Sequence, residues 1–558
     1  MMRGGGKLEK DLINRRVLLI GLDAATFDVV APLATQGKLP ILSKLMAEGT
    51  QAKLRSVIPP LTPAAWTAQV TGKNPGKHGI YDFLKRRKTG YGTDLVTAQD
   101  RRADAIWNIL SRAGRRVGVI NVPMTYPPEP VNGFMISGLG TPESRRDFTY
   151  PAGLLDEIEK NVERYRIWHR SFPRPDAADE FLSDMFDIVD CQSRAARYLM
   201  SKEKWDFFMI VYQIADWAQH YYWKYCDESH PAFDKSSTAH TVIERTYRKL
   251  DSLVGELLEA AGKETAVIVM SDHGMGPCVK NVYVNNWLAV NNYLKYKKGI
   301  RYALHSLGFT SELVVKIMVS LGLGDIIVNA RESKKALLKF FLTTDDIDWS
   351  RTVAYSYGND GKIVLNLKGR EPQGIIEQGS QFENTRDEII KKLKAFVDPE
   401  SGASVCDAVF KSEDVFNGPY APGPNSLEGA DIIPLMSRYH QDFHWVSKSV
   451  LGPAPDNISA NHRLHGIFIM RGQGVKHEAC IPEVSILDTA PTILYLMGVP
   501  IPKDMDGNLI AGAFEDEHLK SVNPVYTEAQ AQQTRGASLT PEDEEEITNR
   551  LRALGYVA

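Results

Sequence analysis

The chain has 558 residues, of which 43% are hydrophobic and 24% charged, and a formal net charge of −3. This balance is typical of a soluble globular protein, and the length predicts more than one domain. The small negative charge excludes a basic face for nucleic acid and a polybasic membrane signal.

The cysteines and the apolar segments indicate the compartment. The five cysteines are scattered, odd in number and without C-x-x-C spacing, which argues against a disulfide framework or a cysteine zinc cluster. Residues 1–16 contain no apolar segment with a cleavage site, so no signal peptide is expected. The apolar stretch 313–328 is too short and too interrupted for a membrane span. We therefore expect a cytoplasmic protein.

The first predicted element is a buried strand over residues 16–23 (RVLLIGLD), followed by a helical pattern over 28–49. A strand that ends in aspartate can place a carboxylate at the carboxyl edge of a sheet, where open α/β sheets bind ligands. Asp23 is therefore a candidate metal ligand. A helix N-cap is an equally good interpretation of this residue.

Thr62 follows a Pro-Pro turn and precedes Pro63, which suits the first position of a helix. Thr62 is therefore predicted to be the N-cap, with its hydroxyl near unpaired backbone N–H groups. That position suits a nucleophile that attacks phosphorus, because a helix N-terminus attracts anions. A plain capping threonine is the alternative. The segment 72–79 (GKNPGKHG) lacks P-loop spacing and is interpreted as a loop, in which His78 is structural.

Two further strands end in polar residues. The apolar run 205–213 leads into Asp216 and His220, whose i,i+4 spacing places both side chains on one helix face, where they can hold one metal. The run 266–271 is the clearest buried strand, and it ends at Asp272 and His273. A carboxylate beside an imidazole suits Zn, Mn or Fe. A polar strand-to-loop turn is the bland alternative for this pair.

Residues 284–429 carry no ligand motif. Lysine-rich helical material (293–339) precedes short strands with turn residues, such as 354–367, so an inserted α+β cap that sets substrate choice is expected. Its basic residues could meet a second anionic group, or could form a solvated helix face. The final segment, 541–558, is an acidic amphipathic pattern that predicts a docked or dimer-contacting helix.

These motifs, in this order, resemble the alkaline phosphatase superfamily. The similarity rests on Asp23, on the Pro-Leu-Thr62-Pro element with its downstream TGKNPGKHG, and on the Ser-Asp272-His273-Gly strand end. The nearest branch by motif is the type I phosphodiesterase/nucleotide pyrophosphatase group, with its phosphohydrolase and phosphomutase relatives. The resemblance predicts Asp-x-x-x-His after an intervening strand, which Asp216 and His220 match.

The same family pattern has a late histidine four residues before the glycine of G-I-F-I. This selects His462 as a ligand. His465 falls where relatives often have Glu, and a supporting or structural role is expected for it.

The resemblance implies an α/β fold with a doubly wound, mostly parallel sheet flanked by helices. We expect this alkaline phosphatase-like core at residues 14–283 plus 430–520, the inserted cap at 284–429, and a C-terminal tail at 521–558.

The resemblance also implies two divalent metal ions, Zn or Mn, with Fe as a further candidate. Asp216, His220 and His462 would hold one ion. Asp23, Asp272, His273 and the Thr62 oxygen would hold the other. Thr62 would attack in line to form a covalent phospho-threonine intermediate, which water then hydrolyses. The expected substrate is a small phosphorylated molecule or nucleotide, and a homo-oligomer is compatible with the sequence.

One residue departs from the family pattern. Nucleotide pyrophosphatases usually carry an Asn at the end of the H-G-I-x-D segment, where this chain has Phe83. The oxyanion partner would then be the Thr62 backbone N–H or Lys73. Diester or nucleotide pyrophosphate cleavage is the first hypothesis; phosphomonoesterase, phosphonate hydrolase and phosphomutase activities are alternatives. Thr62 cannot supply the formylglycine of a sulfatase. A metal-stabilised binding protein is the non-enzyme alternative.

Overall fold

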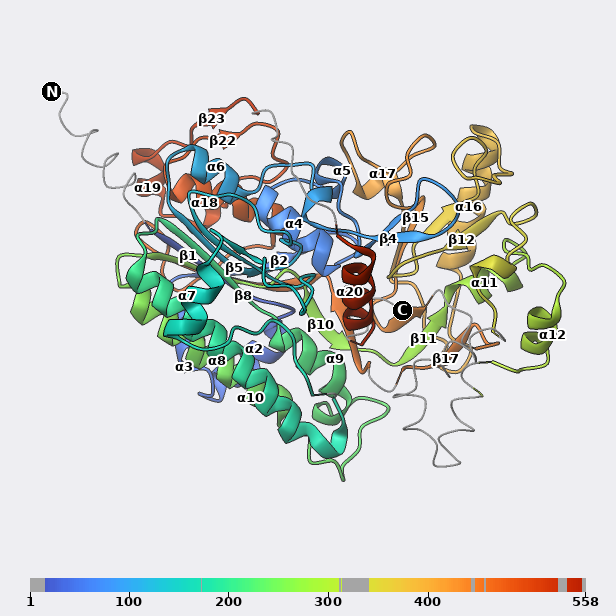
Figure 1. The fold of residues 1–558 in the computed structure, drawn as a ribbon, viewed down its shortest axis with the longest axis horizontal. Coiled ribbons are helices and arrows are strands. Elements are labelled where there is room, and N and C mark those ends of the chain that lie inside the picture. Colours follow the sequence, from blue (N-terminus) through green and yellow to red (C-terminus); the bar gives the residue numbers. More distant parts are fainter. Residues whose placement is uncertain are drawn as a thin grey trace.

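The computed structural model describes residues 16–171, 173–310, 313, 341–442, 447–455, 458–529 and 539–553. Its core is a ten-stranded, mostly parallel sheet with helices on both faces (Figure 1). The strand order is β20-β2-β19-β9-β1-β8-β5-β6-β7, with β21 beside β2. The predicted fold class, a doubly wound α/β sheet, is confirmed.

The three central strands form because their sequences are continuous apolar runs, as expected of parallel strands covered on both faces. In β1, β8 and β9 every residue is buried. The strands of the sheet are β1 (Val17–Leu22), β2 (Thr50–Arg55), β5 (Val117–Val122), β6 (Gly133–Ser137), β7 (Thr149–Tyr150), β8 (Phe207–Tyr212), β9 (Ala266–Met270), β19 (His465–Arg471), β20 (Ala479–Cys480) and β21 (Val484–Ser485). β19 runs antiparallel to both of its neighbours, β2 and β9.

Two hydrophobic clusters lie on the two faces of this sheet. Leu18 and Ile20 of β1 belong to one cluster and Leu19 to the other, as the alternation of a strand requires. Helices of the first cluster are α2 (Phe27–Thr35), α3 (Pro40–Ala47), α8 (Ala178–Lys202), α9 (Ile214–Cys226) and α10 (Val242–Ala261). Those of the second are α4 (Thr62–Thr71), α6 (Ile106–Arg112) and α18 (Thr489–Leu496).

A third hydrophobic cluster lies beside the sheet. Most of its members belong to residues 280–442, which we name the outer subdomain (Figure 1). It contains the four-stranded antiparallel sheet β12 (Ala354–Ser356), β13 (Ile363–Leu365), β15 (Ile432–Leu435) and β14 (Ala408–Lys411), with α16 (Ser380–Lys394). Two small sheets connect it to the core: β10 (Gly274–Pro277) with β18 (Ala460–Arg463), and β11 (Lys280–Tyr283) with β16 (Tyr439–Asp442) and β17 (Leu451–Pro453). The predicted insertion, 284–429, falls inside the outer subdomain.

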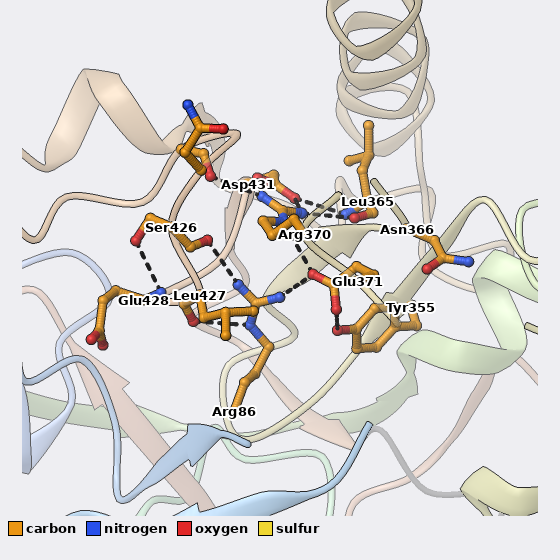
Figure 2. A network of polar contacts seen from close by, with 12 residues as sticks. Arg86, Tyr355, Leu365, Asn366, Arg370, Glu371, Ser426, Leu427, Glu428 and Asp431 are labelled. Carbon is orange, nitrogen blue, oxygen red and sulfur yellow. Dashed lines mark hydrogen bonds and ion pairs between the residues drawn. The ribbon is translucent and has the colours of Figure 1, made fainter. Parts of the chain in front are cut away.

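A buried ionic network joins the outer subdomain to the core hairpin of β3 (Leu84–Arg86) and β4 (Thr93–Leu95) (Figure 2). Arg86 pairs with Glu371, and Arg370 also contacts Glu371 at 3.0 Å. Arg370 holds Asp431 through two hydrogen bonds of 2.7 Å. All four side chains are at most 5% exposed. The outer subdomain is therefore fixed to the core by charge pairs that exclude water.

Apart from the C-terminal helix α20, the remaining elements are short. They are α5 (Pro75–His78), α7 (Leu154–Asn161), α11 (Val284–Val290), α12 (Ile300–Ser306), α17 (Ser412–Val415), α19 (Asp516–Ser521), α20 (Pro541–Ala553), β22 (Ile501–Pro502) and β23 (Tyr526–Thr527). The expected C-terminal helix docks on the core, because Asp543 pairs with Arg145 at 2.6 Å and Ile547 and Leu551 are buried.

Some predicted segments lie outside the described residues: most of the helical stretch 293–339, the apolar stretch 313–328 beyond its first residue, and the end of the tail, 554–558. Within the described ranges, no helix has the length and apolar character needed to cross a membrane.

Candidate active site

Three neighbouring parallel strands bring four of the predicted residues together. Asp23 follows β1, Asp216 lies in the first turn of α9 after β8, and Asp272 and His273 follow β9. Because β9, β1 and β8 are adjacent in the sheet, their carboxyl ends meet at one edge. This edge is where open α/β sheets bind ligands.

His220 and His462 join this edge from two other elements. His220 lies one helical turn after Asp216 on α9, as the i,i+4 spacing predicts. His462 belongs to β18, which pairs antiparallel with β10, so that His462 lies opposite Met275. Since β10 begins directly after His273, this pairing returns the late part of the chain to the end of β9.

Thr62 is the first residue of α4, and Leu61 is the N-cap. The predicted N-cap position was therefore wrong by one residue. No side-chain hydrogen bond caps this helix, and the Thr62 hydroxyl instead lies 3.2 Å from Nε2 of His273. The residue is fully buried. Its hydroxyl thus faces the ligand cluster, beside backbone N–H groups that a helix leaves unpaired at its first turn.

The six side chains form two adjacent groups, which we name by their first aspartate. In the Asp216 group (Asp216, His220 and His462), Nε2 of His220 lies 3.0 Å from Nε2 of His462 and 3.4 Å from Oδ1 of Asp216. In the Asp23 group (Asp23, Asp272 and His273), Nε2 of His273 lies 3.3 Å from Asp272 and 3.7 Å from Asp23. The rings of His273 and His462 stack at 3.8 Å, so the two groups touch.

Backbone carbonyls fix the tautomer of each histidine. Nδ1 of His220 lies 2.9 Å from the carbonyl of Ala460, and Nδ1 of His462 lies 2.9 Å from that of Pro60. Nδ1 of His273 lies 3.0 Å from the carbonyl of Gly274. A carbonyl only accepts, so each Nδ1 must carry the proton, and each Nε2 then presents a lone pair to the site.

The carboxylates of the Asp23 group are held in the same way. Trp66 donates to Oδ2 of Asp23 at 3.0 Å, and the Ala24 N–H donates to Oδ1 of Asp272 at 3.3 Å. The other oxygen of each carboxylate, Oδ1 of Asp23 and Oδ2 of Asp272, is buried and has no hydrogen-bond donor within the described residues. One oxygen of each group is thus anchored, and the other is directed at the cluster.

The charges of the Asp23 group are not balanced by protein groups alone. Burial and the neighbouring Asp272 raise the pKa of Asp23 well above its usual range. Burial and the nearby Asp216 raise the pKa of Asp272 to about 8. Burial, and the nearby His462, hold the pKa of His273 well below its usual range.

Two facing imidazole lone pairs at 3.0 Å repel one another unless a proton or a cation lies between them. Buried carboxylates likewise need a counter-charge. Imidazole nitrogens and carboxylate oxygens in sets of three are the ligands of catalytic zinc and related metals. The residues present therefore fit divalent cations.

Two sequence candidates lie away from this cluster. Lys73 follows α4, and ten helical residues separate it from Thr62 by roughly 15 Å; its ammonium pairs with Asp504. The structure thus does not bring Lys73 to Thr62 as an oxyanion partner. His465 is half-exposed and pairs with Glu483 at 2.6 Å, which leaves it a structural contact at the start of β19. Phe83 is fully buried in the first hydrophobic cluster.

Trp66, which anchors Asp23, and Asp360, which lines a pocket with His462, were not predicted as site residues. Trp66 carries a sequence signal: it lies four residues after Thr62 on the same helix face. Asp360 lies in a glycine-rich turn of the outer subdomain, far from any ligand motif, and no spacing rule connects it to the site.

The fold and the site define the class: an α/β protein with buried aspartates and histidines at the carboxyl edge of its sheet and a buried threonine at a neighbouring helix N-terminus. Residues 17–336 match the family model of the type I phosphodiesterase / nucleotide pyrophosphatase proteins, and the chain belongs to this family. The family resemblance is confirmed, and the chain is a phosphoric ester hydrolase of a family that depends on divalent metals.

Solved structures of two hydrolases are similar to this chain. Human ectonucleotide pyrophosphatase / phosphodiesterase 5 has 14% identity and a TM-score of 0.48, with 91% of this chain and 99% of that chain covered. Phosphonoacetate hydrolase from Sinorhizobium meliloti 1021, in complex with phosphonoformate, has 16% identity and a TM-score of 0.49, with 88% and 96% covered. The comparison with curated proteins gives no match.

Proposed function

We propose that the protein cleaves phosphodiester or nucleotide pyrophosphate-type bonds through a covalent intermediate on Thr62. The observation that carries this proposal is the position of the Thr62 hydroxyl, 3.2 Å from Nε2 of His273 at a buried helix N-terminus. The backbone N–H groups at the start of α4 face an anion placed there, because they have no partner within the helix.

The Asp216 group would hold one divalent cation, and the Asp23 group with the Thr62 oxygen would hold a second, with Zn or Mn as the metals. When bound, two such cations supply the charge that lowers the pKa of an attacking hydroxyl and neutralises phosphoryl oxygens. The chain's own residues do the rest. Trp66 and the Ala24 N–H orient the two aspartates, and the carbonyls of Ala460 and Pro60 orient two of the histidines.

The reaction has two displacements. Thr62 Oγ1 forms a bond to phosphorus as the bond to the leaving oxygen breaks; the hydroxyl proton is lost and the leaving group gains one. Water then attacks the phospho-threonine, which frees the Thr62 hydroxyl and releases the remaining phosphoryl product. Because the attack is in line, the leaving group departs on the side opposite Thr62. Thr62 contacts the Asp23 group, so the leaving group departs beside the Asp216 group.

Phe83 favours a second candidate. The residue that helps to hold a phosphate oxygen in nucleotide pyrophosphatases is replaced by a buried, apolar ring. A monoester presents more charged oxygens to the cations than a diester, so phosphomonoesterase or phosphomutase activity is the alternative for this site.

The test compares bis(p-nitrophenyl) phosphate with p-nitrophenyl phosphate, using protein stripped of metal and reloaded with Zn or Mn. Thr62→Ala should lower turnover by at least about 10³-fold. The matched control is Thr67→Ala, another buried threonine of α4, which should keep its activity. Mass spectrometry of acid-quenched protein should find the phosphoryl group on the peptide that contains Thr62.

Preference for the diester supports the first proposal, and preference for the monoester supports the alternative. Activity retained in Thr62→Ala would contradict both.

A further inference from the structure

A turn of the outer subdomain reaches the site. Residues 357–362 connect β12 to β13. The turn is held in one shape by left-handed backbone at Gly358, Asp360 and Gly361, with φ of 65°, 60° and 62°. A Cβ at Gly358 would lie 2.5 Å from Oδ2 of Asp82, so only glycine allows this approach to the core.

Asp82 of the core anchors this turn. The backbone N–H of Asn359 donates to Oδ2 of Asp82 at 3.0 Å, and its side-chain amide donates to Oδ1 at 3.1 Å. Lys362 forms an ion pair with the same carboxylate, and both side chains of the pair are at most 2% exposed. These contacts fix the turn to the core beside the candidate site, as the ionic network fixes the rest of the outer subdomain.

This anchoring places Asp360 beside the Asp216 group. Asp360 and His462 line the same small pocket, together with Pro59 and Pro60, which precede Thr62. Asp360 also lies close enough to His462 and His220 to interact electrostatically with both. Oδ2 of Asp360 is buried, and no donor among the described residues reaches it. A buried carboxylate oxygen without a donor is costly unless a ligand satisfies it.

The position of this oxygen relative to Thr62 indicates which ligand group it would meet. Thr62 contacts His273 of the Asp23 group, whereas Asp360 borders His462 of the Asp216 group. Under the proposed reaction, the leaving group departs on the Asp360 side. A carboxylate there attracts hydroxyl or ammonium donors and repels an anionic leaving group such as pyrophosphate.

We propose that Asp360 is a specificity-determining residue that accepts a hydrogen bond from a donor group on the leaving alcohol. The inference rests on the proposed function and narrows its substrates to phosphoric esters of polyols or amino alcohols. Esters whose leaving group is itself a phosphate are then poor substrates.

The test uses two symmetric diesters, so that either ester bond gives the same leaving group. Glycerophosphoglycerol releases glycerol, and dipropyl phosphate releases an alcohol without further hydroxyls. Bis(p-nitrophenyl) phosphate, whose leaving group has no donor, is the reference substrate. The metal-loaded full chain should show a higher kcat/KM for glycerophosphoglycerol than for dipropyl phosphate.

Asp360→Asn keeps the shape and tolerates left-handed backbone, and it should lower kcat/KM for glycerophosphoglycerol about 10-fold. Asp360→Gly also tolerates this backbone and removes the acceptor, so the loss should reach about 100-fold, the range of a hydrogen bond to a charged group. Turnover of the reference substrate and metal content should stay near wild type, and thermal stability should not fall. Asp345→Asn, at an exposed aspartate of the same subdomain, is the matched control and should change nothing.

Four results would overturn the inference. Equal kcat/KM for the two alkyl diesters, or an unchanged preference in Asp360→Gly, removes the specificity role alone. A parallel loss of metal and of reference turnover in both variants makes Asp360 a metal ligand instead. Absence of reference turnover in the wild-type chain rejects the proposed function itself, and the inference with it.

Discussion

The candidate site and the ionic network of the outer subdomain both bury charged side chains, but they balance charge differently. In the network, Arg86 and Arg370 face Glu371 and Asp431, so two positive groups meet two negative ones (Figure 2). Tyr355 adds a hydrogen bond of 3.0 Å to Glu371. Every charge has a partner of opposite sign within the protein.

The site has no such balance. In the Asp23 group, two aspartates face His273, whose proton position leaves a lone pair, not an N–H group, toward the cluster. Burial therefore raises the pKa of Asp23 and of Asp272. A network whose charges are all paired within the protein stabilises the junction between the outer subdomain and the core by itself. A group with unpaired buried charges needs a bound ligand. The difference separates structural charge burial from functional charge burial.

The largest expected effect comes from removing one charge of the ionic network. Glu371→Gln leaves the buried Arg86 guanidinium without its carboxylate, which should cost about 3–5 kcal/mol of unfolding free energy. Chemical denaturation measures the loss. Glu377→Gln is the control, because Glu377 pairs with Lys368 on the surface and should change stability by less than about 0.5 kcal/mol. Equal effects in the two variants would contradict the distinction.

At the candidate site, removing the cations should destabilise the protein, whereas removing a buried carboxylate from the metal-free protein should stabilise it. Chelation should lower the stability of the wild-type protein by about 2.7 kcal/mol relative to protein with free metal at 100 times its Kd. Asp272→Asn should lose this metal-dependent gain. Without metal, however, Asp272→Asn should be more stable than the wild type at pH 8, because a buried carboxylate is gone. Thermal melts with and without chelator check both effects, and an apo variant less stable than the apo wild type would refute the second.

The smallest effect concerns His78, a buried histidine that stays uncharged in the folded protein. Burial, with Arg101 and Lys73 nearby, lowers the pKa of His78 to about 3, whereas an unfolded histidine has a pKa near 6.5. Only the unfolded state gains this proton between the two values, so stability falls by about 1.4 kcal/mol per pH unit below pH 6.5.

His78→Asn retains an acceptor for the Ile80 N–H, which bonds Nδ1 at 3.2 Å. Its melting temperature should depend less on pH between 7 and 5 than that of the wild type. Parallel curves for the two proteins would show that His78 is already protonated in the fold.

The core was predictable because its elements follow local rules. Buried parallel strands are continuous apolar runs, and the expected strands at 16–23 and 266–271 appear as β1 and β9. A residue that follows such a strand must lie at the carboxyl edge of the sheet, so Asp23 and Asp272 could be placed together without coordinates. The cap of α4 was missed by one residue, because the Thr62 hydroxyl lies beside His273 and does not cap the helix.

The contacts between the outer subdomain and the core escaped prediction for a physical reason. Asp360 reaches the site through contacts between segments far apart in sequence, such as Asn359 with Asp82. No spacing or periodicity in the sequence predicts the contact between Asn359 and Asp82. The same holds for Glu371 and Arg86, since the long-range ion pair leaves no periodic pattern in either segment. Lys73 shows the reverse error: proximity in sequence suggested a role that a straight helix prevents.

The place of β19 in the sheet has a consequence for synthesis of the chain. β2 and β9 are made early, yet both pair with β19, whose residues 465–471 leave the ribosome much later. Until then the nascent protein exposes the edges of two strands, which is a hazard for association with other chains. His462 lies in β18, directly before this strand, so a chain arrested before residue 460 carries five of the six aspartates and histidines of the candidate site and an open sheet. During synthesis, the strand that joins β2 to β9 and the last histidine of the candidate site therefore emerge together.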